Sequence, residues 1–274
     1  MPPSRYFLLF LVLAVTPALY AKTYTVAGNY QVYVPPFFWR DHCTQQPRGF
    51  GWQLQRHLWK DLGVEFAPLH LSLTNESDTQ QLYQRMQRGE IDVFQSMPPT
   101  ENRVLSTTKE PFFDPASAVF HKKNSPWQYR DWASLKNKNG GWVSPNGFDL
   151  RSMTFQNYAR DNLKMTAYSS YQSGFDALSH GEIDYILTYR AVGAAVIKHY
   201  GYDEVSAATT KGISRAGYLA IAKNSPLAAR SDEIDTLLRH YKQAGLLQVL
   251  LQLSMSNWLE SRNDDCAPSP PPRQ

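Results

Sequence analysis

Two stretches of the sequence decide the fold: Met86-Gln-Arg-Gly-Glu-Ile-Asp-Val-Phe94 and Leu178-Ser-His-Gly-Glu-Ile-Asp-Tyr-Ile186. In both, the end of an apolar helical pattern is followed by a glycine and then by a short apolar run. This order is typical of a helix, a left-handed glycine that ends it, and a buried strand. A shared Gly-Glu-Ile-Asp can arise by accident, but here the setting is repeated too. The repeat predicts two similar α/β units, with Asp92 and Asp184 fixing a turn or strand edge rather than doing chemistry.

Around the first stretch, strand patterns alternate with helix patterns. The strands are expected at 23–27, 64–71 and 91–94, and the helices at 52–62 and 79–88. The first helix has apolar residues at 54, 58, 59 and 62, which lie on one helical face, and Gly63 ends it. This βαβαβ order predicts a mainly parallel sheet with helices on both faces.

A second repeated motif indicates how the two units are connected. Lys-Asn-Ser-Pro occurs at 123–126 and again at 223–226, each time after an apolar strand pattern, at 116–120 and 217–222. The chain is therefore expected to leave the first unit, build the second and return, so that the helices from Ser231 onward join the first unit. This predicts an α/β protein of two lobes joined by a two-strand hinge, with a small-ligand site between the lobes.

The expected boundaries follow from this path. Lobe 1 is discontinuous, at 22–118 and 218–262; lobe 2 covers 119–217, with hinge strands at its ends; and the proline-rich tail 263–274 is expected to be disordered. At 1–21, Arg5 precedes an apolar run of about ten residues, which is too short for the roughly 20 that span a bilayer. Small residues follow, as in a secretory signal peptide, which predicts a periplasmic protein.

Composition excludes several classes of partner. The net charge of +4 over 274 residues is spread without long runs of like charge, so no nucleic acid is expected. The two cysteines, Cys43 and Cys266, cannot form a zinc set, and neither metal nor cofactor is expected. Because thiols oxidise outside the cytoplasm, a Cys43–Cys266 disulfide is one hypothesis and two free thiols are the other.

From Thr23 to Leu259 the chain resembles the extracellular solute-binding proteins of family 3, the type II periplasmic binding proteins of polar amino-acid ABC transporters. The resemblance rests on the order and spacing of short motifs: Pro35-Pro36-Phe37, Gly49-Phe50, Gly89-Glu-Ile-Asp92, Thr100-Glu-Asn-Arg103, Glu110-Pro-Phe-Phe113, Ser134-Leu135 and Gly181-Glu-Ile-Asp184. It implies a monomer that does no covalent chemistry and closes on a small polar ligand, an amino acid or related carboxylate. It also implies an ABC permease in the inner membrane as the partner.

The resemblance also implies site residues. Arg103 stands where the family grips the ligand carboxylate, for which a planar guanidinium is suited. Ser96 matches a position that hydrogen-bonds the ligand. Phe37 and Trp39 match its aromatic walls, with ordinary core packing as the alternative. Gly147 and Asp149 fall at an expected helix start, where free amides suit an anion.

One position departs from the family. Tyr189 stands where amino-acid binders have an acidic residue for the ligand's α-ammonium, and a phenol does not supply that charge. Either another residue, with Asp149 the nearest, supplies it, or the ligand is not a simple α-amino acid. A degenerate or sensory binding module is an alternative function. A cyclohexadienyl dehydratase-like enzyme on this fold is a more remote one, since no general acid is singled out.

Overall fold

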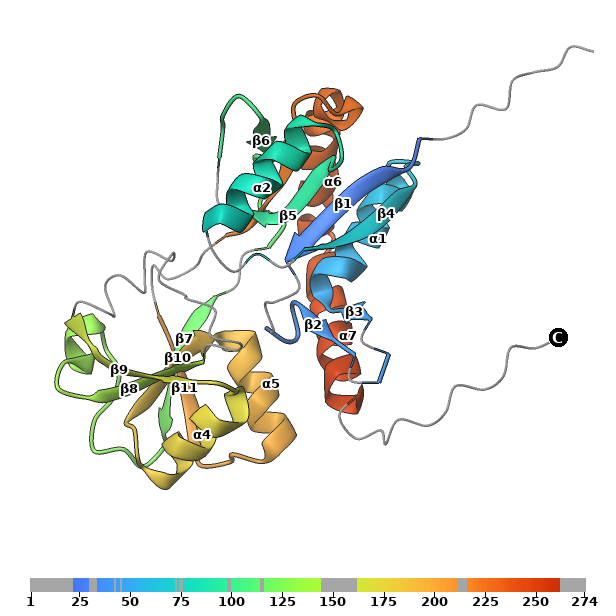
Figure 1. Ribbon diagram of the computed structural model, residues 1–274. Helices are drawn as coiled ribbons and strands as arrows, with labels where there is room; N and C mark the ends of the chain where they lie inside the picture. Colours follow the sequence, from blue (N-terminus) through green and yellow to red (C-terminus); the bar gives the residue numbers. More distant parts are fainter. Residues whose placement is uncertain are drawn as a thin grey trace, which may run out of the picture.

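A computed structural model describes residues 22–29, 34–41, 43–44, 46–71, 73, 76–97, 100–113, 116–143, 162–210 and 216–261. The signal segment predicted at 1–21 and the tail predicted at 263–274 lie outside these residues. The described chain forms two lobes, each built on one five-stranded sheet (Figure 1). The predicted two-lobed α/β fold is confirmed.

The first sheet has the order β4-β1-β5-β12-β6. Its parallel strands are β1 (Tyr24–Asn29), β4 (Phe66–Leu71) and β5 (Val93–Met97), separated along the chain by helices α1 (Phe50–Asp61) and α2 (Glu76–Gln87). Strand β12 (Tyr218–Ala222) runs antiparallel to both β5 and β6 (Leu105–Thr107). The βαβαβ order predicted from apolar spacing is therefore present.

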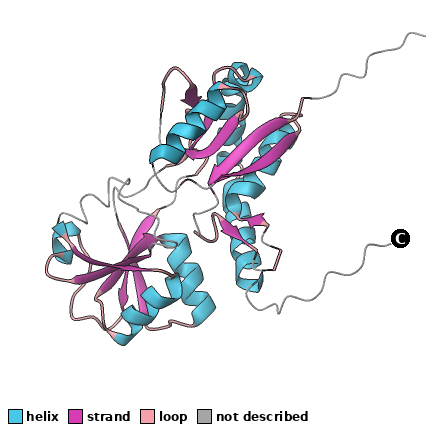
Figure 2. Cartoon of the chain, viewed as in Figure 1, coloured by secondary structure: helices cyan, strands magenta, loops and turns pink. Residues whose placement is uncertain are grey.

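The second sheet has the order β11-β7-β10-β8-β9, with helices packed against it (Figure 2). Strands β8 (Asn139–Val143), β9 (Lys164–Tyr168) and β10 (Tyr185–Tyr189) are parallel, and β7 (Ser117–Lys122) is antiparallel to β10 and to β11 (Val205–Thr209). Helices α4 (Tyr171–His180) and α5 (Arg190–Tyr200) and the 3-10 helix η1 (Trp132–Leu135) are the helices of this lobe among the described residues.

After β12 the chain builds the 3-10 helix η4 (Pro226–Arg230), then α6 (Ser231–Gln243) and α7 (Leu246–Ser261). These helices lie against α1 in the first lobe, where Leu58 and Trp59 join Leu238 and Leu250 in the buried core. The return of the chain to its first unit, predicted from the repeated Lys-Asn-Ser-Pro motif, explains this packing. None of the helices among the described residues is long and apolar enough to cross a membrane.

The two Gly-Glu-Ile-Asp corners are built alike. Gly89 and Gly181 have φ of 74° and 79°, the left-handed region that a side chain disfavours. The Asp92 Oδ2 atom accepts a hydrogen bond from the Thr25 amide at 2.9 Å, and Asp184 Oδ2 accepts one from the Asn139 amide at 2.7 Å. Each aspartate thus holds the start of the neighbouring parallel strand, β1 or β8, which confirms the structural role predicted for both.

Two segments cross between the lobes and are joined to each other. Phe113 and Gly217 form an antiparallel bridge, with Phe113 N to Gly217 O at 3.0 Å and Gly217 N to Phe113 O at 2.6 Å. On the second-lobe side, the Thr210 hydroxyl donates to the Ser117 carbonyl at 3.0 Å. The two-strand hinge predicted from the sequence is therefore present.

Candidate functional site

The carboxyl ends of the parallel strands in both lobes meet at the crossing segments. In the first lobe, β5 ends at Met97, which is paired with Tyr218, the residue after the Gly217 bridge. In the second lobe, β10 ends at Tyr189, which is paired with Ser117 at the start of β7. In open α/β sheets ligands bind outside the carboxyl ends of the strands. This junction is therefore the candidate site.

Three aromatic rings join the lobes at this junction. The Phe37 ring follows β1, the Tyr189 ring ends β10, and their centroids lie 6.0 Å apart at an interplanar angle of 85°. Phe113, on the first crossing segment, is 4.3 Å from Phe37 and 6.0 Å from Tyr189. Such edge-to-face pairs are the favoured geometry for aromatic rings. Phe37 and Tyr189, two of the site residues that the resemblance implies, are thus brought together from the two lobes, and Phe113, which the sequence did not single out for the site, joins them.

The position of Phe37 is fixed by its own turn and by two helices. The Phe37 amide donates to the Val34 carbonyl at 2.9 Å, and the Pro36 carbonyl accepts from the Phe50 amide at 3.0 Å and from the Ser254 hydroxyl of α7 at 2.6 Å. Gly49 has φ of 116°, and a Cβ there would lie 2.3 Å from the Phe37 carbonyl oxygen. The Gly49-Phe50 motif therefore lets α1 begin directly against the Phe37 turn.

Trp39 is placed in the core. It begins the two-residue strand β2 (Trp39–Arg40), which pairs with β3 (Pro47–Arg48), and its side chain is buried with those of α1. Phe37 is equally buried, at 4% exposure. Both rings are packed in the core, which is the alternative that the sequence left open for them.

Ser96 lies next to the end of β5, at the candidate site, although its side chain is outside the described residues. Its neighbour Gln95 is 2% exposed, and its amide oxygen has no hydrogen-bond partner among the described residues. The Gln95 amide nitrogen lies over Gly28 of β1, where a Cβ would be 2.2 Å away. A glutamine within an apolar strand was the available sequence signal for this buried polar group.

Arg103 is not brought together with the aromatic rings. It lies in a turn whose Asn102 side chain accepts from the Val104 amide at 2.8 Å and from the Leu105 amide at 3.0 Å. The Val104 carbonyl accepts from the Lys223 amide, just past the end of β12 and at the other end of that strand from the Gly217 bridge. The Arg103 side chain is exposed there.

The second lobe supplies the remaining expected positions. Gly147 and Asp149 follow β8 and lie outside the described residues. Arg190, the residue after Tyr189, is exposed, and its amide donates to the Ala116 carbonyl at 2.7 Å.

Tyr168 ends β9 at the same edge of the sheet. Partial burial, with a smaller effect from the Glu182 carboxylate, raises the pKa of its phenol. This phenol is therefore an uncharged hydrogen-bonding group at neutral pH.

Cys43 lies in the loop between β2 and β3. The Asp41 Oδ1 atom accepts hydrogen bonds from the Cys43 amide at 3.1 Å, the Thr44 amide at 2.8 Å and the Thr44 hydroxyl at 2.9 Å. Cys266 lies outside the described residues, so its pairing with Cys43 stays a prediction.

Comparisons with known proteins identify the fold. No family model and no curated protein matches the sequence. Among solved structures, the amino acid ABC transporter substrate-binding protein AbpA from Streptococcus pneumoniae, bound to L-arginine, is similar with a TM-score of 0.57 and 18% identity over 85% of this chain and 94% of that one. The GluR0 ligand-binding core in complex with L-glutamate is similar with a TM-score of 0.62 and 14% identity, over 88% of this chain and 99% of that one.

A third similar structure is a histidine kinase sensor domain with similarity to periplasmic binding proteins, with a TM-score of 0.57 and 16% identity over 84% of this chain and 94% of that one. Together these matches define the class of the fold: this is a two-lobed, periplasmic-binding-protein-like chain. Identities at this level establish the fold alone.

Proposed function

We propose that this protein is a periplasmic solute-binding protein that captures a small polar ligand, an amino acid or a related carboxylate, by hinge closure. The observation that carries the proposal is the meeting of the carboxyl ends of both parallel strand sets at a two-strand hinge, with Phe37 and Tyr189 in contact across it. Similar structures that hold L-arginine and L-glutamate support an amino acid as the ligand class.

The proposed ligand contacts are Ser96 and Phe37 from the first lobe and Tyr189, Gly147 and Asp149 from the second. Ser96 is the next-to-last residue of β5 and Tyr189 ends β10, both at the junction, which supports their role. A tyrosine at 189 leaves a ligand ammonium without a charged partner at that position, which favours a carboxylate whose amine is absent or bound elsewhere. Trp39 and Phe37 belong to the same buried core cluster.

We propose that the protein acts as a monomer and delivers its ligand to an ABC permease in the inner membrane. The predicted signal segment and the similarity to AbpA, a transporter substrate-binding protein, support this. A sensory ligand-binding module is the second candidate, supported by the similar histidine kinase sensor domain. In both, closure of the lobes is the output, and no covalent chemistry is proposed.

Thermal unfolding of the ligand-stripped chain 22–274 against amino acids, simple organic acids, opines and polyamines tests this proposal. A ligand that binds only the folded state stabilises it by about 2.7 kcal/mol at 100 times its dissociation constant. We expect such a shift with an amino acid or a carboxylate. A flat response to the whole panel would count against ligand capture and in favour of the degenerate module.

Two variants locate the binding. Ser96→Ala should weaken the response, because Ser96 lies at the carboxyl end of β5. Arg103→Ala should leave it unchanged, because the Arg103 backbone lies at the other end of β12 from the hinge bridge. Loss of binding in Arg103→Ala would instead show that this guanidinium reaches the ligand, as the family resemblance implies.

A further inference from the structure

Helix α5 of the second lobe touches the first lobe at both of its ends. At its start, Tyr189 contacts Phe37 and Phe113, as described above. Near its last turn, the His199 ring lies 5.6 Å from the Trp258 ring of α7, at an interplanar angle of 40°. Trp258 is 1% exposed. The first lobe therefore holds α5 at two points.

These two points belong to one apolar cluster that passes between the lobes. Its buried members include Leu58 and Trp258 of the first lobe and Val192 and Val196 of α5. Half-buried side chains of α7 and α5, among them Met255 and Ile197, pack against it. The lobes are thus joined by packed side chains as well as by the two crossing segments.

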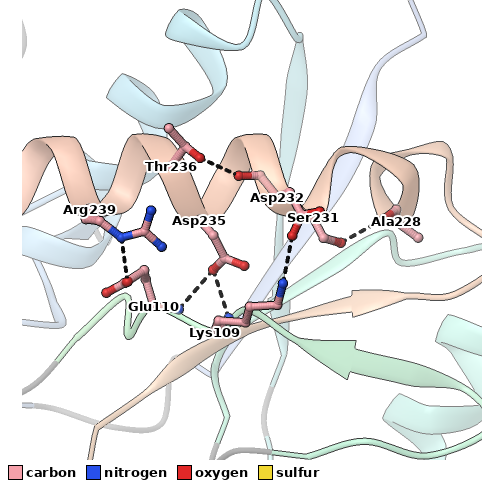
Figure 3. Close-up of polar contacts among 8 residues, drawn as sticks. All are labelled: Lys109, Glu110, Ala228, Ser231, Asp232, Asp235, Thr236 and Arg239. Carbon is pink, nitrogen blue, oxygen red and sulfur yellow. Dashed lines mark hydrogen bonds and ion pairs between the residues drawn. The ribbon is translucent and has the colours of Figure 1, made fainter.

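The first-lobe side of the hinge is fixed to α6 (Figure 3). The Asp235 Oδ1 atom, on a residue 3% exposed, accepts from the Lys109 amide at 2.8 Å and from the Glu110 amide at 2.9 Å. Arg239 pairs with the Glu110 carboxylate at 2.9 Å. The chain just before the Phe113–Gly217 bridge is therefore anchored to the first lobe.

The two ends of α5 lie at different distances from this hinge. The Tyr189 end is next to it, because Tyr189 is paired with Ser117 and the Arg190 amide binds the Ala116 carbonyl. His199 lies nine residues further along the helix, about 14 Å at 1.5 Å per residue. A rotation at the crossing segments about an axis perpendicular to α5 therefore displaces the His199 end more than the Tyr189 end.

We propose that α5 is a brace that holds the two lobes in one relative orientation, with His199 against Trp258 as its outer contact. Movement that separates α5 from α7 breaks this contact, and movement at the hinge end shifts Tyr189 against Phe37 and Phe113. The brace thereby sets how much of the protein is in the arrangement seen here, and this role does not depend on the proposed function.

Distances between the lobes in the ligand-free chain test the brace. Spin labels carried by a ketone-bearing amino acid at positions 84 on α2 and 172 on α4, both exposed, avoid the native cysteines. We expect one dominant distance. His199→Ala should raise the ratio of displaced to braced molecules roughly 2- to 12-fold, the range for loss of one aromatic pair. Lys198→Ala, an exposed neighbour on the same turn, is the matched control and should leave the distribution unchanged.

The hinge end is tested by Tyr189→Leu, which removes two ring contacts and should change the same ratio about 5- to 150-fold. Because both ends restrain one motion, the effects should multiply in the double variant and bring the displaced population into the measurable range. Tyr189→Leu alone serves if His199→Ala does not fold. The brace is refuted if the folded double variant keeps the distance distribution of the unsubstituted chain, or if that chain is already broadly distributed.

Discussion

Asp92 and Asp184 occupy equivalent corners of the two lobes but carry different numbers of buried hydrogen bonds, which makes them a matched pair for measuring stability. Asp92 is 5% exposed and accepts from the Thr25 amide at 2.9 Å and from the Ser225 hydroxyl at 2.7 Å. Asp184 is half-buried, and its side chain accepts from the Asn139 amide at 2.7 Å.

Replacement of each aspartate by alanine should therefore have unequal effects. Asp92→Ala leaves two largely buried donors without an acceptor, at about 1–3 kcal/mol each, so the free energy of unfolding should fall by about 2–6 kcal/mol. Asp184→Ala removes one hydrogen bond at a half-buried site and should lower it by about 0.5–1.5 kcal/mol. Ser225→Ala removes one of the two hydrogen bonds to Asp92, and the resulting decrease in the free energy of unfolding should lie between these two ranges.

Urea denaturation followed by far-ultraviolet circular dichroism and tryptophan fluorescence provides the measurement. If the two signals change at different urea concentrations, the lobes unfold separately and the data are fitted with two transitions. A single free energy of unfolding is defined only for a two-state transition. Equal losses for Asp92→Ala and Asp184→Ala, or a larger loss for Asp184→Ala, would refute the reasoning that buried partners decide the difference.

Three further predictions concern other sites. Gln55→Met should leave the unfolding free energy unchanged or raise it in urea titrations, because the Gln55 amide is fully buried and neither of its polar atoms has a partner in the part of the chain that the structure describes; a loss above about 1 kcal/mol would contradict this. Gly193→Ala should lower the melting temperature, because its Cβ would lie 2.1 Å from the Phe120 ring and overpacking costs about 1–3 kcal/mol; an unchanged melting temperature would count against this close approach. The Thr44 amide, with smaller effects from the Thr44 hydroxyl and Arg48, lowers the pKa of Asp41 against the opposing effect of burial. The Asp41 carboxylate therefore stabilises the fold at pH values above its unfolded pKa of about 3.9. This stabilisation is lost as the pH falls through the folded pKa. The stability difference between the unsubstituted chain and Asp41→Asn should therefore shrink as the pH falls below about 4 in acid titrations, and a constant difference would contradict the assignment.

The sequence predicted the fold well because its signals are local and repeated. Glycine stops at 89 and 181 and the aspartates that follow them determine equivalent corners in both lobes, and the repeated Lys-Asn-Ser-Pro motif indicated the return of the chain. Apolar spacing was enough to place α1 and the parallel strands around it.

The site was predicted only in part, because side-chain neighbours depend on contacts distant in the sequence. Phe37 and Tyr189 come into contact across the hinge, and no local sequence pattern predicts this contact. Phe113 contacts both rings and belongs to Glu110-Pro-Phe-Phe113, a motif that served only as part of the family resemblance. Arg103 was expected at the site from motif order, whereas the hydrogen bond between Val104 and Lys223 places its turn at the other end of β12 from the hinge bridge. The contact of His199 with Trp258 joins two helices with no sequence signal linking them.

Hydrogen–deuterium exchange with the ligand found in the thermal screen is the most direct test of capture between the lobes. The proposal predicts that saturation with this ligand slows amide exchange in both lobes at once, in the segment that follows β1 around Phe37 and at the start of α5 after Tyr189. Protection confined to one lobe, or absent from both of these segments, would contradict binding at the junction of the two sheets.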